Sequence, residues 1–244
     1  MKKIIFTALL GVTTVTGQLF AQKTPTPQIL KSHKDISLFT KLKGETVTPI
    51  SLFNGKNFNG WYTYTDKYGK NNDVEKAFRI EDGVMRFDGE SMGYLCTKQT
   101  FKNYYLRVVF RWGEKKYPPR KDSKRDSGVL YHFSTSAADK VWPTSIECQI
   151  QEDDCGDYWC IGTTADSPNQ IENNGLKRII RTENFETSDW NTIEIICIDD
   201  KSEHYVNGHL VNNAYNLSQT KGKILLQLEC AEVFYKTVEM LPLK

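Results

Sequence analysis

Short segments of alternating apolar and polar residues run through most of this chain and constrain its fold more than any other feature. A half-buried β-strand points successive side chains to opposite faces, so this alternation predicts strands. Turn signals separate the segments, and Asp82-Gly83 and Asn207-Gly208 favour tight hairpins. No segment keeps a helical period over four turns. We therefore expect an all-β jelly-roll sandwich of two antiparallel sheets, with a ligand site on one face.

The predicted strands follow one another over the second two thirds of the chain. They are 78–88 as a hairpin, 93–99, 104–112, 127–134, 145–151, 175–182, 190–199, 204–213 as a hairpin, and 223–243. A chain of this length without a repeat period is compatible with one large all-β domain. We assign this domain to residues 49–244.

The first residues resemble a secretory signal peptide. Two lysines, an apolar run from Ile4 to Val15 and small or polar residues up to Ala21 follow the order of regions in such a segment. We expect cleavage near Ala21, export to the periplasm or the extracellular space, and a partly ordered leader over 22–48. The apolar run is shorter than the roughly 20 residues of a membrane span. A permanent N-terminal anchor is thus the less favoured alternative, and no membrane insertion is expected.

The charge of the mature chain bounds its partners. Loss of Lys2 and Lys3 with the signal peptide reduces the 32 basic residues by two, which leaves as many basic as acidic residues, 30 of each. Nucleic acids and anionic membrane surfaces select proteins with a basic excess, so neither is an expected partner. Aromatic residues make up 12% of the chain. They suit a protein that stacks sugars, but β-propensity and core filling explain them equally well.

The six cysteines lack the Cys-x-x-Cys pairs and Cys/His spacings of zinc sites. Cys148, Cys197 and Cys230 fall in alternating apolar segments, where we expect them as small buried side chains. Cys155 and Cys160 bracket a short loop, and in an exported protein they could either form a disulfide or stay free.

One predicted face gathers polar side chains. In the segment 145–151, Ile146, Cys148 and Ile150 point to the core, which leaves Glu147 and Gln149 on the opposite face. The parity of 127–134 is ambiguous, because its aromatic residues compete with Leu130 for the core. If the aromatic residues point inward, the same phasing of the other strands completes the set as Arg111, His132, Glu147, Gln149, Gln227 and Glu229. Such a set could grip and act on a polyhydroxylated ligand. The alternative is that these are ordinary solvated side chains on the exposed side of a sheet.

The segment after this strand carries further acidic and aromatic residues. Those that could complete a site are Asp154, Asp157, Tyr158 and Trp159. The acidic cluster Glu152, Asp153, Asp154 and Asp157 could also bind calcium, although it lacks EF-hand spacing. Asp126-Ser127-Gly128 fits either a turn or a support for the site. The chain has no GxSxG, P-loop, HExxH or strand-linked GxGxxG motif.

Six stretches occur in an order that resembles a known family. They are ISLFNGKNFNGW (50–61), GYLCTKQTFKNYYLRVVFRWGEKKYPPR (93–120), RDSGVLYHF (125–133), SIECQIQEDDCGDYW (145–159), DWNTIEI with YVNGHLVN (189–212), and GKILLQLECAEVFYKTVEMLPL (222–243). Together they are similar to the 3-keto-disaccharide hydrolases, predicted glycosyl hydrolases with a concanavalin A-like jelly roll. The resemblance implies an exported protein whose partner is a carbohydrate. The chain departs from the common family pattern at Leu228-Glu229, where many members have a histidine.

The resemblance implies chemistry at the C2 proton of a 3-keto sugar, because its removal gives an enolate that expels the C1 substituent before water adds. This needs a base near C2, a cation at the 3-oxygen and an acid for the leaving group. As catalytic residues we expect Glu147 or His132 as the base and Arg111 at the oxyanion. Residues expected to bind or orient the substrate are Lys98, Gln149, Gln227, Glu229, Asp126, Trp61, Asp157 and Trp159.

Two other functions fit the same residues. Glu147 and Glu229 could hydrolyse a glycoside directly, with retention at a carboxyl separation of roughly 5 Å or inversion at roughly 6.5 to 9.5 Å. Alternatively, the face could bind a glycan without catalysis. No cofactor and no metal ligands are assigned, and participation of a divalent cation is left open.

Overall fold

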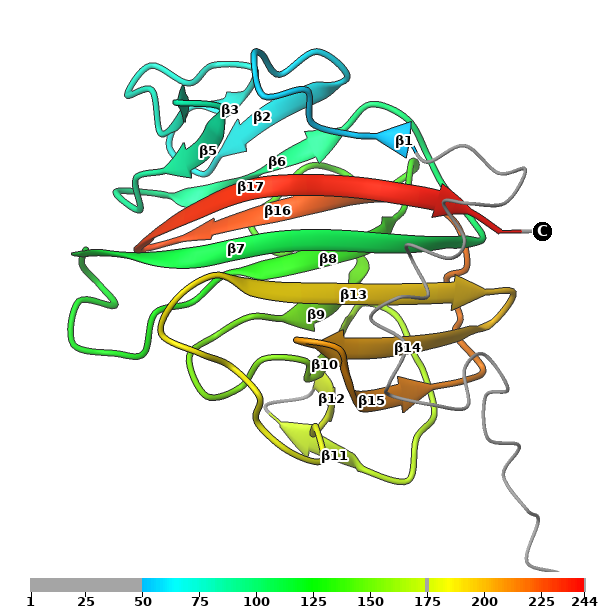
Figure 1. Ribbon diagram of the computed structural model, residues 1–244. Helices are drawn as coiled ribbons and strands as arrows, with labels where there is room; N and C mark the ends of the chain where they lie inside the picture. The colour runs from blue at the N-terminus through cyan, green and yellow to red at the C-terminus, as the bar shows by residue number, and fades with distance from the viewer. Residues whose placement is uncertain (1–49, 174–175, 244) are drawn as a thin grey trace, which may run out of the picture.

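The computed structural model describes residues 50–173 and 176–243, which form two antiparallel β-sheets packed face to face (Figure 1). The predicted signal peptide and leader, residues 1–48, lie outside the described residues. Among the described residues there is no helix with the length and apolarity that a membrane span requires. The prediction of an all-β sandwich is confirmed.

The first sheet, sheet A, has eight strands. Their spatial order is β15 (His209–Ala214), β14 (Lys201–Val206), β13 (Asn191–Ile198), β7 (Tyr104–Lys116), β17 (Ala231–Pro242), β5 (Val84–Phe87) and β4 (Phe78–Glu81), with β1 (Ile50–Ser51) paired to β17. Both predicted hairpins are present. Asp82 and Asn207 each have a φ of 50° and precede a glycine of positive φ, as a tight hairpin turn requires.

The second sheet, sheet B, has nine strands. Their spatial order is β11 (Gln170–Asn173), β12 (Leu176–Ile179), β10 (Tyr158–Ile161), β9 (Ser145–Gln149), β8 (Gly128–Phe133), β16 (Lys223–Glu229), β6 (Met92–Thr97), β2 (Trp61–Thr65) and β3 (Gly69–Lys70). The sequence analysis took β10 for a loop. It is a strand because Tyr158 and Cys160 alternate into the core while Trp159 and Ile161 face outward.

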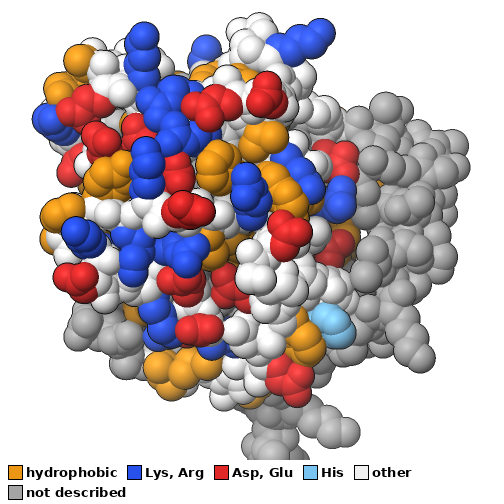
Figure 2. All heavy atoms as spheres, turned by 60° about the vertical axis from the view of Figure 1, so that its left-hand side comes forward, with side chains coloured by type: hydrophobic (Ala, Val, Ile, Leu, Met, Phe, Trp, Pro, Cys, Tyr) orange, Lys and Arg blue, Asp and Glu red, His pale blue; other side chains and the backbone are white. Residues whose placement is uncertain are grey.

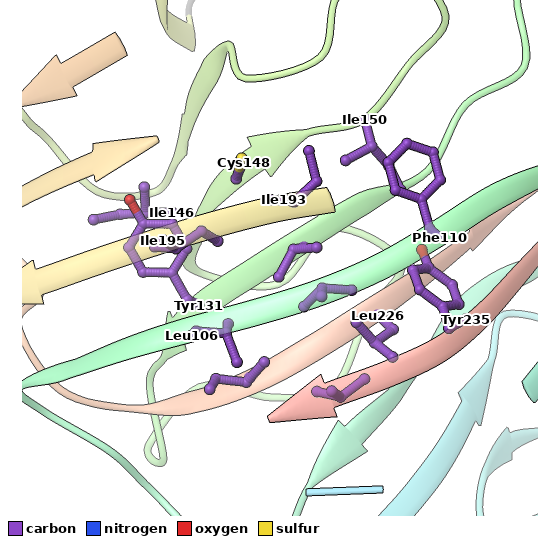
Figure 3. Close-up of a cluster of buried hydrophobic side chains, with 14 of the residues drawn as sticks. Leu106, Phe110, Tyr131, Ile146, Cys148, Ile150, Ile193, Ile195, Leu226 and Tyr235 are labelled. Carbon is purple, nitrogen blue, oxygen red and sulfur yellow. The ribbon is translucent and has the colours of Figure 1, made fainter. Parts of the chain in front are cut away.

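The main core lies between the sheets, and Figure 3 shows part of it. Ile146, Cys148 and Ile150 of the β9 segment point into it, as predicted, and meet residues of sheet A such as Ile193 and Phe110. The polar residues of β9 therefore face away from sheet A. We call the face of sheet B that points away from sheet A its outer face.

All six cysteines are buried and free. The optional Cys155–Cys160 disulfide is therefore not formed. Cys148 and Cys197 belong to the main core, as predicted. Cys230 is also buried, as predicted, and is the single residue that links β16 to β17 in the chain.

Candidate functional site

A cavity of about 430 Å³ lies on the outer face of sheet B. Its volume falls within the range of small-molecule sites. The lining residues are Arg120, Asp126, Trp142, Glu147, Gln149, Gln151, Asp154, Trp159, Ile161, Arg178 and Glu229. They come from four strands of sheet B and from the loops at its rim, so the fold itself assembles the cavity.

Glu147 lies at the centre of sheet B. Its neighbours in the ladder are Leu130 of β8 and Trp159 of β10. A Cβ atom added to Gly128 would lie 2.1 Å from the Glu147 Oε1 atom, so the glycine makes room for this carboxyl group. Glu147 is 4% exposed, and no described residue forms a hydrogen bond with its carboxyl oxygens.

Two more carboxyl groups lie beside Glu147 and share one arginine. Arg120 contacts Asp126 through Nη2, at 2.6 Å from Oδ2, and donates a short hydrogen bond to Glu229 through Nη1. Gln151 donates to the same Oδ2 atom of Asp126. The second oxygen of Asp126, Oδ1, is buried without a hydrogen-bond partner. Three acids and one shared cation thus crowd one end of the cavity.

This crowding changes the acidity of the group. Burial, together with the Asp126 and Glu229 carboxylates, raises the pKa of Glu147 well above its usual range, against the opposite effect of Arg120. Burial and Glu229 raise the pKa of Asp126 to about 7. Burial also raises the pKa of Glu229, although its contacts with Arg120 and Trp142 act in the opposite direction. All three carboxyl groups therefore keep a proton to a higher pH than ordinary carboxyl groups do.

Aromatic side chains and a fixed cation form the walls. Trp159 lies in the cavity with its indole nitrogen buried and unpartnered, and the guanidinium of Arg178 lies 5.1 Å from its ring. Asp157, which is fully buried, accepts hydrogen bonds from Nε and Nη2 of Arg178 and from the backbone and side chain of Arg181. Trp142 also lines the cavity and is 46% exposed.

Six of the residues that the sequence analysis considered for the site line the cavity, namely Glu147, Gln149, Glu229, Asp126, Asp154 and Trp159. The phasing of β9 and β16 that placed the first three is confirmed. Gln149 also has a local role, because its Oε1 atom accepts the backbone N–H groups of Ile150 and Gln151.

The placement of Arg111 was wrong. The predicted inward residues of β7 do point to the core, but β7 belongs to sheet A, so Arg111 lies on the outer face of that sheet. Its guanidinium is 5.1 Å from the Trp190 ring and 4.6 Å from the Phe234 ring. Alternation reveals on which side of its own sheet a residue lies but not which sheet the strand joins.

The placement of His132 was also wrong. His132 has a φ of 55°, and the pairing of β8 with β16 is irregular next to it. This irregularity breaks the alternation of β8. Val129 and Tyr131 point into the core, but Phe133 points to the outer face. His132 is fully buried, and its Nδ1–H donates to the Gln219 carbonyl at 2.9 Å. Burial lowers its pKa to about 4. It does not line the cavity and cannot serve there as the base.

Four other predicted residues lie outside the cavity lining. Trp61 packs in the main core and donates its indole N–H to the Leu52 carbonyl at 2.6 Å. Lys98 is exposed just beyond β6. Gln227 is buried on the outer face next to Tyr94. Asp157 acts from beneath the wall by holding Arg178.

The sequence analysis missed Arg120, Trp142, Gln151 and Arg178. Trp142 had a usable signal, because it is a large aromatic residue beside a proline in an otherwise polar loop. Arg120 lies in the long loop after β7, and Arg178 lies two strands away from Glu147. No local pattern links these two arginines to the site.

The acidic cluster considered for calcium is dispersed. Glu152 and Asp153 line a separate cavity of about 380 Å³, Asp154 faces the main one, and Asp157 is bound by arginines. No group of three or more His, Cys, Asp or Glu side chains in the described part of the chain is arranged to hold a metal ion.

On the face in Figure 2, basic and acidic side chains are intermixed rather than separated into patches.

The chain matches one protein family and is similar to several solved structures. The model of the 3-keto-α-glucoside-1,2-lyase-like domain matches residues 48–241. No curated protein sequence matches the chain. Among solved structures, it is similar to a predicted glycosyl hydrolase of Parabacteroides distasonis, with 20% identity, a TM-score of 0.58, and coverage of 84% of this chain and 97% of the other.

A β-glucanase of Bacillus licheniformis is also similar, with 14% identity, a TM-score of 0.54, and coverage of 82% of this chain and 100% of the other. At these identities, the likeness shows a shared fold.

Proposed function

Because the chain belongs to the family of 3-keto-α-glucoside-1,2-lyase-like domains, we propose that it is an exported enzyme that cleaves 3-keto-glycosides by eliminating the C1 substituent. The observation that carries this proposal is the Glu147 carboxyl group. It is buried in a sugar-sized cavity, has no hydrogen bond to any described residue, and lies beside two further acids. A buried polar group without a partner is costly, and a bound ligand would supply the missing partner.

The acids differ in the role that each can take. Asp126, whose pKa is raised to about 7, is suited to take a proton near neutral pH. Glu147, whose pKa is raised well above its usual range by burial and by the Asp126 and Glu229 carboxylates, is suited to give one. We assign Asp126 as the base at C2 and Glu147 as the acid at the leaving oxygen. This changes the expectation that Glu147 is the base.

The elimination then proceeds in two steps. Asp126 takes the C2 proton, and the electrons of the C2–H bond move onto the 3-oxygen to give an enolate. Arg120, beside Asp126, stabilises the developing negative charge. The electrons return to re-form the C3 carbonyl and a C1–C2 double bond, the bond from C1 to the leaving oxygen breaks, and Glu147 protonates that oxygen.

Hydration reverses these roles. Glu147, now ionised, takes a proton from water as the water oxygen bonds to C1. The proton on the Asp126 carboxyl group exchanges with solvent water before this step, so Asp126 delivers a solvent-derived proton to C2. The net reaction is hydrolysis of the glycosidic bond. Trp142 and Trp159 are placed to contact the sugar rings, and Arg178 is held at the wall by Asp157. A divalent cation, if one takes part, would act at the 3-oxygen together with Arg120.

The test is incubation of the purified protein with paired ordinary and 3-keto glucosides, with products followed by mass spectrometry in the presence and absence of EDTA. Cleavage of the keto sugars alone supports elimination, and loss of cleavage with EDTA would reveal a metal requirement. Binding without cleavage of either sugar would contradict the enzyme and favour a glycan-binding module.

Direct hydrolysis is the second candidate, because Glu147 and Glu229 face the same cavity. It predicts cleavage of ordinary glycosides, which need no acidic C2 proton. Equal turnover of both sugars in the test above would therefore favour the carboxylate pair.

A further inference from the structure

The loop between β8 and β9, residues 134–144, is fixed to the far side of the outer face of sheet B. Asp139 is its anchor. The Asp139 Oδ1 atom accepts hydrogen bonds from the hydroxyls of Tyr62 and Tyr94, both at 2.7 Å, and Oδ2 accepts one from Lys70 Nζ at 2.9 Å. The three donors belong to β2, β6 and β3. One carboxylate of the loop thus holds three strands that contribute nothing to the cavity lining.

The loop also covers an apolar cluster on the outer face. This cluster consists of Tyr62, Tyr94, Cys96, Leu130, Phe133, Ile161 and Leu225, with Ala137 of the loop packed against it. Tyr94 is 0% and Tyr62 is 4% exposed, although neither side chain points into the main core. The cluster thus buries a part of the outer face that includes residues of β2, β6 and β16, and it borders the cavity at Ile161.

Trp142 follows Asp139 by three residues and lies at the cavity. Its indole N–H donates to Glu229 Oε2 at 3.2 Å, and Glu229 is in turn bound by Arg120. An indole that is 46% exposed and held by a single hydrogen bond needs a fixed loop to keep its position. After Trp142 in the chain, the Pro143 carbonyl accepts a hydrogen bond from Ser145 Oγ at 2.8 Å. Before it, the nearest support is the three-donor anchor at Asp139.

We propose that Asp139 is a positioning residue that acts through Trp142: by anchoring the loop to Tyr62, Tyr94 and Lys70, it holds the indole in the part of the cavity wall that contacts the sugar. The identity of the sugar rests on the proposed function above, whereas the positioning itself does not.

The positioning is tested without a substrate by NMR of the indole N–H groups. The chain has five tryptophans, and Trp142→Phe assigns the signal of Trp142. In Asp139→Ala we expect this signal to shift or broaden while the signal of Trp61, in the core, stays in place. Should Asp139→Ala fail to fold, Asp139→Asn keeps the side-chain shape and weakens the contact with Lys70. An unchanged Trp142 signal in a folded variant would overturn the proposal.

Glu75→Gln is the matched control. Glu75 also accepts hydrogen bonds from a lysine and a tyrosine, Lys67 and Tyr68, but it lies outside the loop and the cavity. Its substitution should leave the Trp142 signal unchanged. A shift of equal size in this variant would mean that the indole responds to any lost surface contact, which would also overturn the proposal.

The effect on binding is tested by a double-mutant cycle on the KM for a 3-keto glucoside. Trp142→Ala should raise KM about tenfold, as expected for loss of one aromatic contact. Asp139→Ala should raise it by a similar factor, and the double variant no further than the larger single effect, because both act through one side chain. Multiplied effects would contradict action through Trp142. If the wild-type protein cleaves no 3-keto sugar, the proposed function fails, and the NMR result alone decides the positioning.

Discussion

The outer faces of the two sheets both carry buried carboxyl groups, but these groups differ in their hydrogen bonding. Glu194 on sheet A and Glu147 on sheet B are each 4% exposed, and burial raises the pKa of both. Glu194 accepts a short hydrogen bond from the Tyr105 hydroxyl and is close enough to Arg107 to be stabilised by its charge. Glu147 receives no hydrogen bond from the described residues. Equal burial thus accompanies a hydrogen-bonded acid on one face and an acid without a hydrogen bond from the described residues on the other.

This difference separates structural from functional carboxyl groups. Glu232, also on sheet A, accepts two hydrogen bonds from Arg86 and one from the backbone N–H of Glu114. A buried acid bound in this way stabilises the sheet, since removing its partners would leave a charge in a medium of low dielectric. An unbound acid contributes no such stability. Its retention at the floor of a cavity is best explained by a ligand that completes its contacts.

The largest expected effect is on turnover. Glu147→Gln should lower kcat on a 3-keto glucoside by about 10² to 10⁴, the range for loss of a general acid. Glu194→Gln is the control with the same chemical change and equal burial, and it should keep kcat within a small factor. Full turnover by Glu147→Gln would remove Glu147 from the mechanism.

Two glycines allow a subtler comparison. An added Cβ at Gly128 would lie 2.1 Å from Glu147 Oε1, and one at Gly113 would lie 2.2 Å from Glu232 Oε2. Gly128→Ala should therefore displace Glu147 and lower kcat by about 10². Gly113→Ala displaces an acid of sheet A equally and should reduce the thermal midpoint without such a loss of kcat. Similar kinetic losses in both variants would point to general distortion of the fold.

The free energy of unfolding should depend more on Glu232 than on Glu147, whereas turnover should depend more on Glu147. Glu232→Gln should reduce the free energy of unfolding by about 1.5 to 3 kcal/mol, as expected for hydrogen bonds to a charged group. Glu147→Gln should leave it unchanged or increase it, because no hydrogen bond is lost and a buried ionisable group is removed. Urea unfolding of both variants measures the difference. A larger loss for Glu147→Gln would mean that this carboxyl group is paired after all.

The last prediction concerns the pH dependence of the free energy of unfolding. Asp126 has an ordinary pKa of 3.8, and burial raises it to about 7 in the folded protein. The folded state then binds more protons than the unfolded state between these values, so this group makes stability fall as pH rises from about 4 to about 7. Asp126→Asn should flatten that part of the pH dependence in urea unfolding. Parallel curves for wild type and variant would exclude the raised pKa.

Much of the fold could be predicted from the sequence, because alternation and turn residues are local signals. The inward residues of β9 and β16 and both hairpins were correct for this reason. Arg111 was misplaced because strand pairing is set by contacts far apart in the chain. His132 was misplaced because its own positive φ reverses the alternation of β8. The adjacent residues contain no turn signal that would predict this backbone conformation.

The candidate site divides in the same way. Glu147, Gln149 and Glu229 lie on regular strands, so their phase placed them correctly on the outer face. Arg120 and Trp142 reach the cavity from loops, whose paths depend on tertiary contacts such as those of Asp139. Glu147, Glu229 and Trp159 were thus predicted, whereas the cation Arg120 and the second aromatic residue of the wall, Trp142, were not.

The most direct test of the central claim is turnover of a 3-keto glucoside in D₂O, with deuterium at C2 of the released sugar measured by mass spectrometry. Elimination followed by hydration removes the C2 proton and returns one exchanged with solvent, so we predict one deuterium at C2 in excess of an enzyme-free control. Cleavage that leaves the C2 hydrogen in place would contradict elimination at the Glu147 cavity and indicate direct hydrolysis.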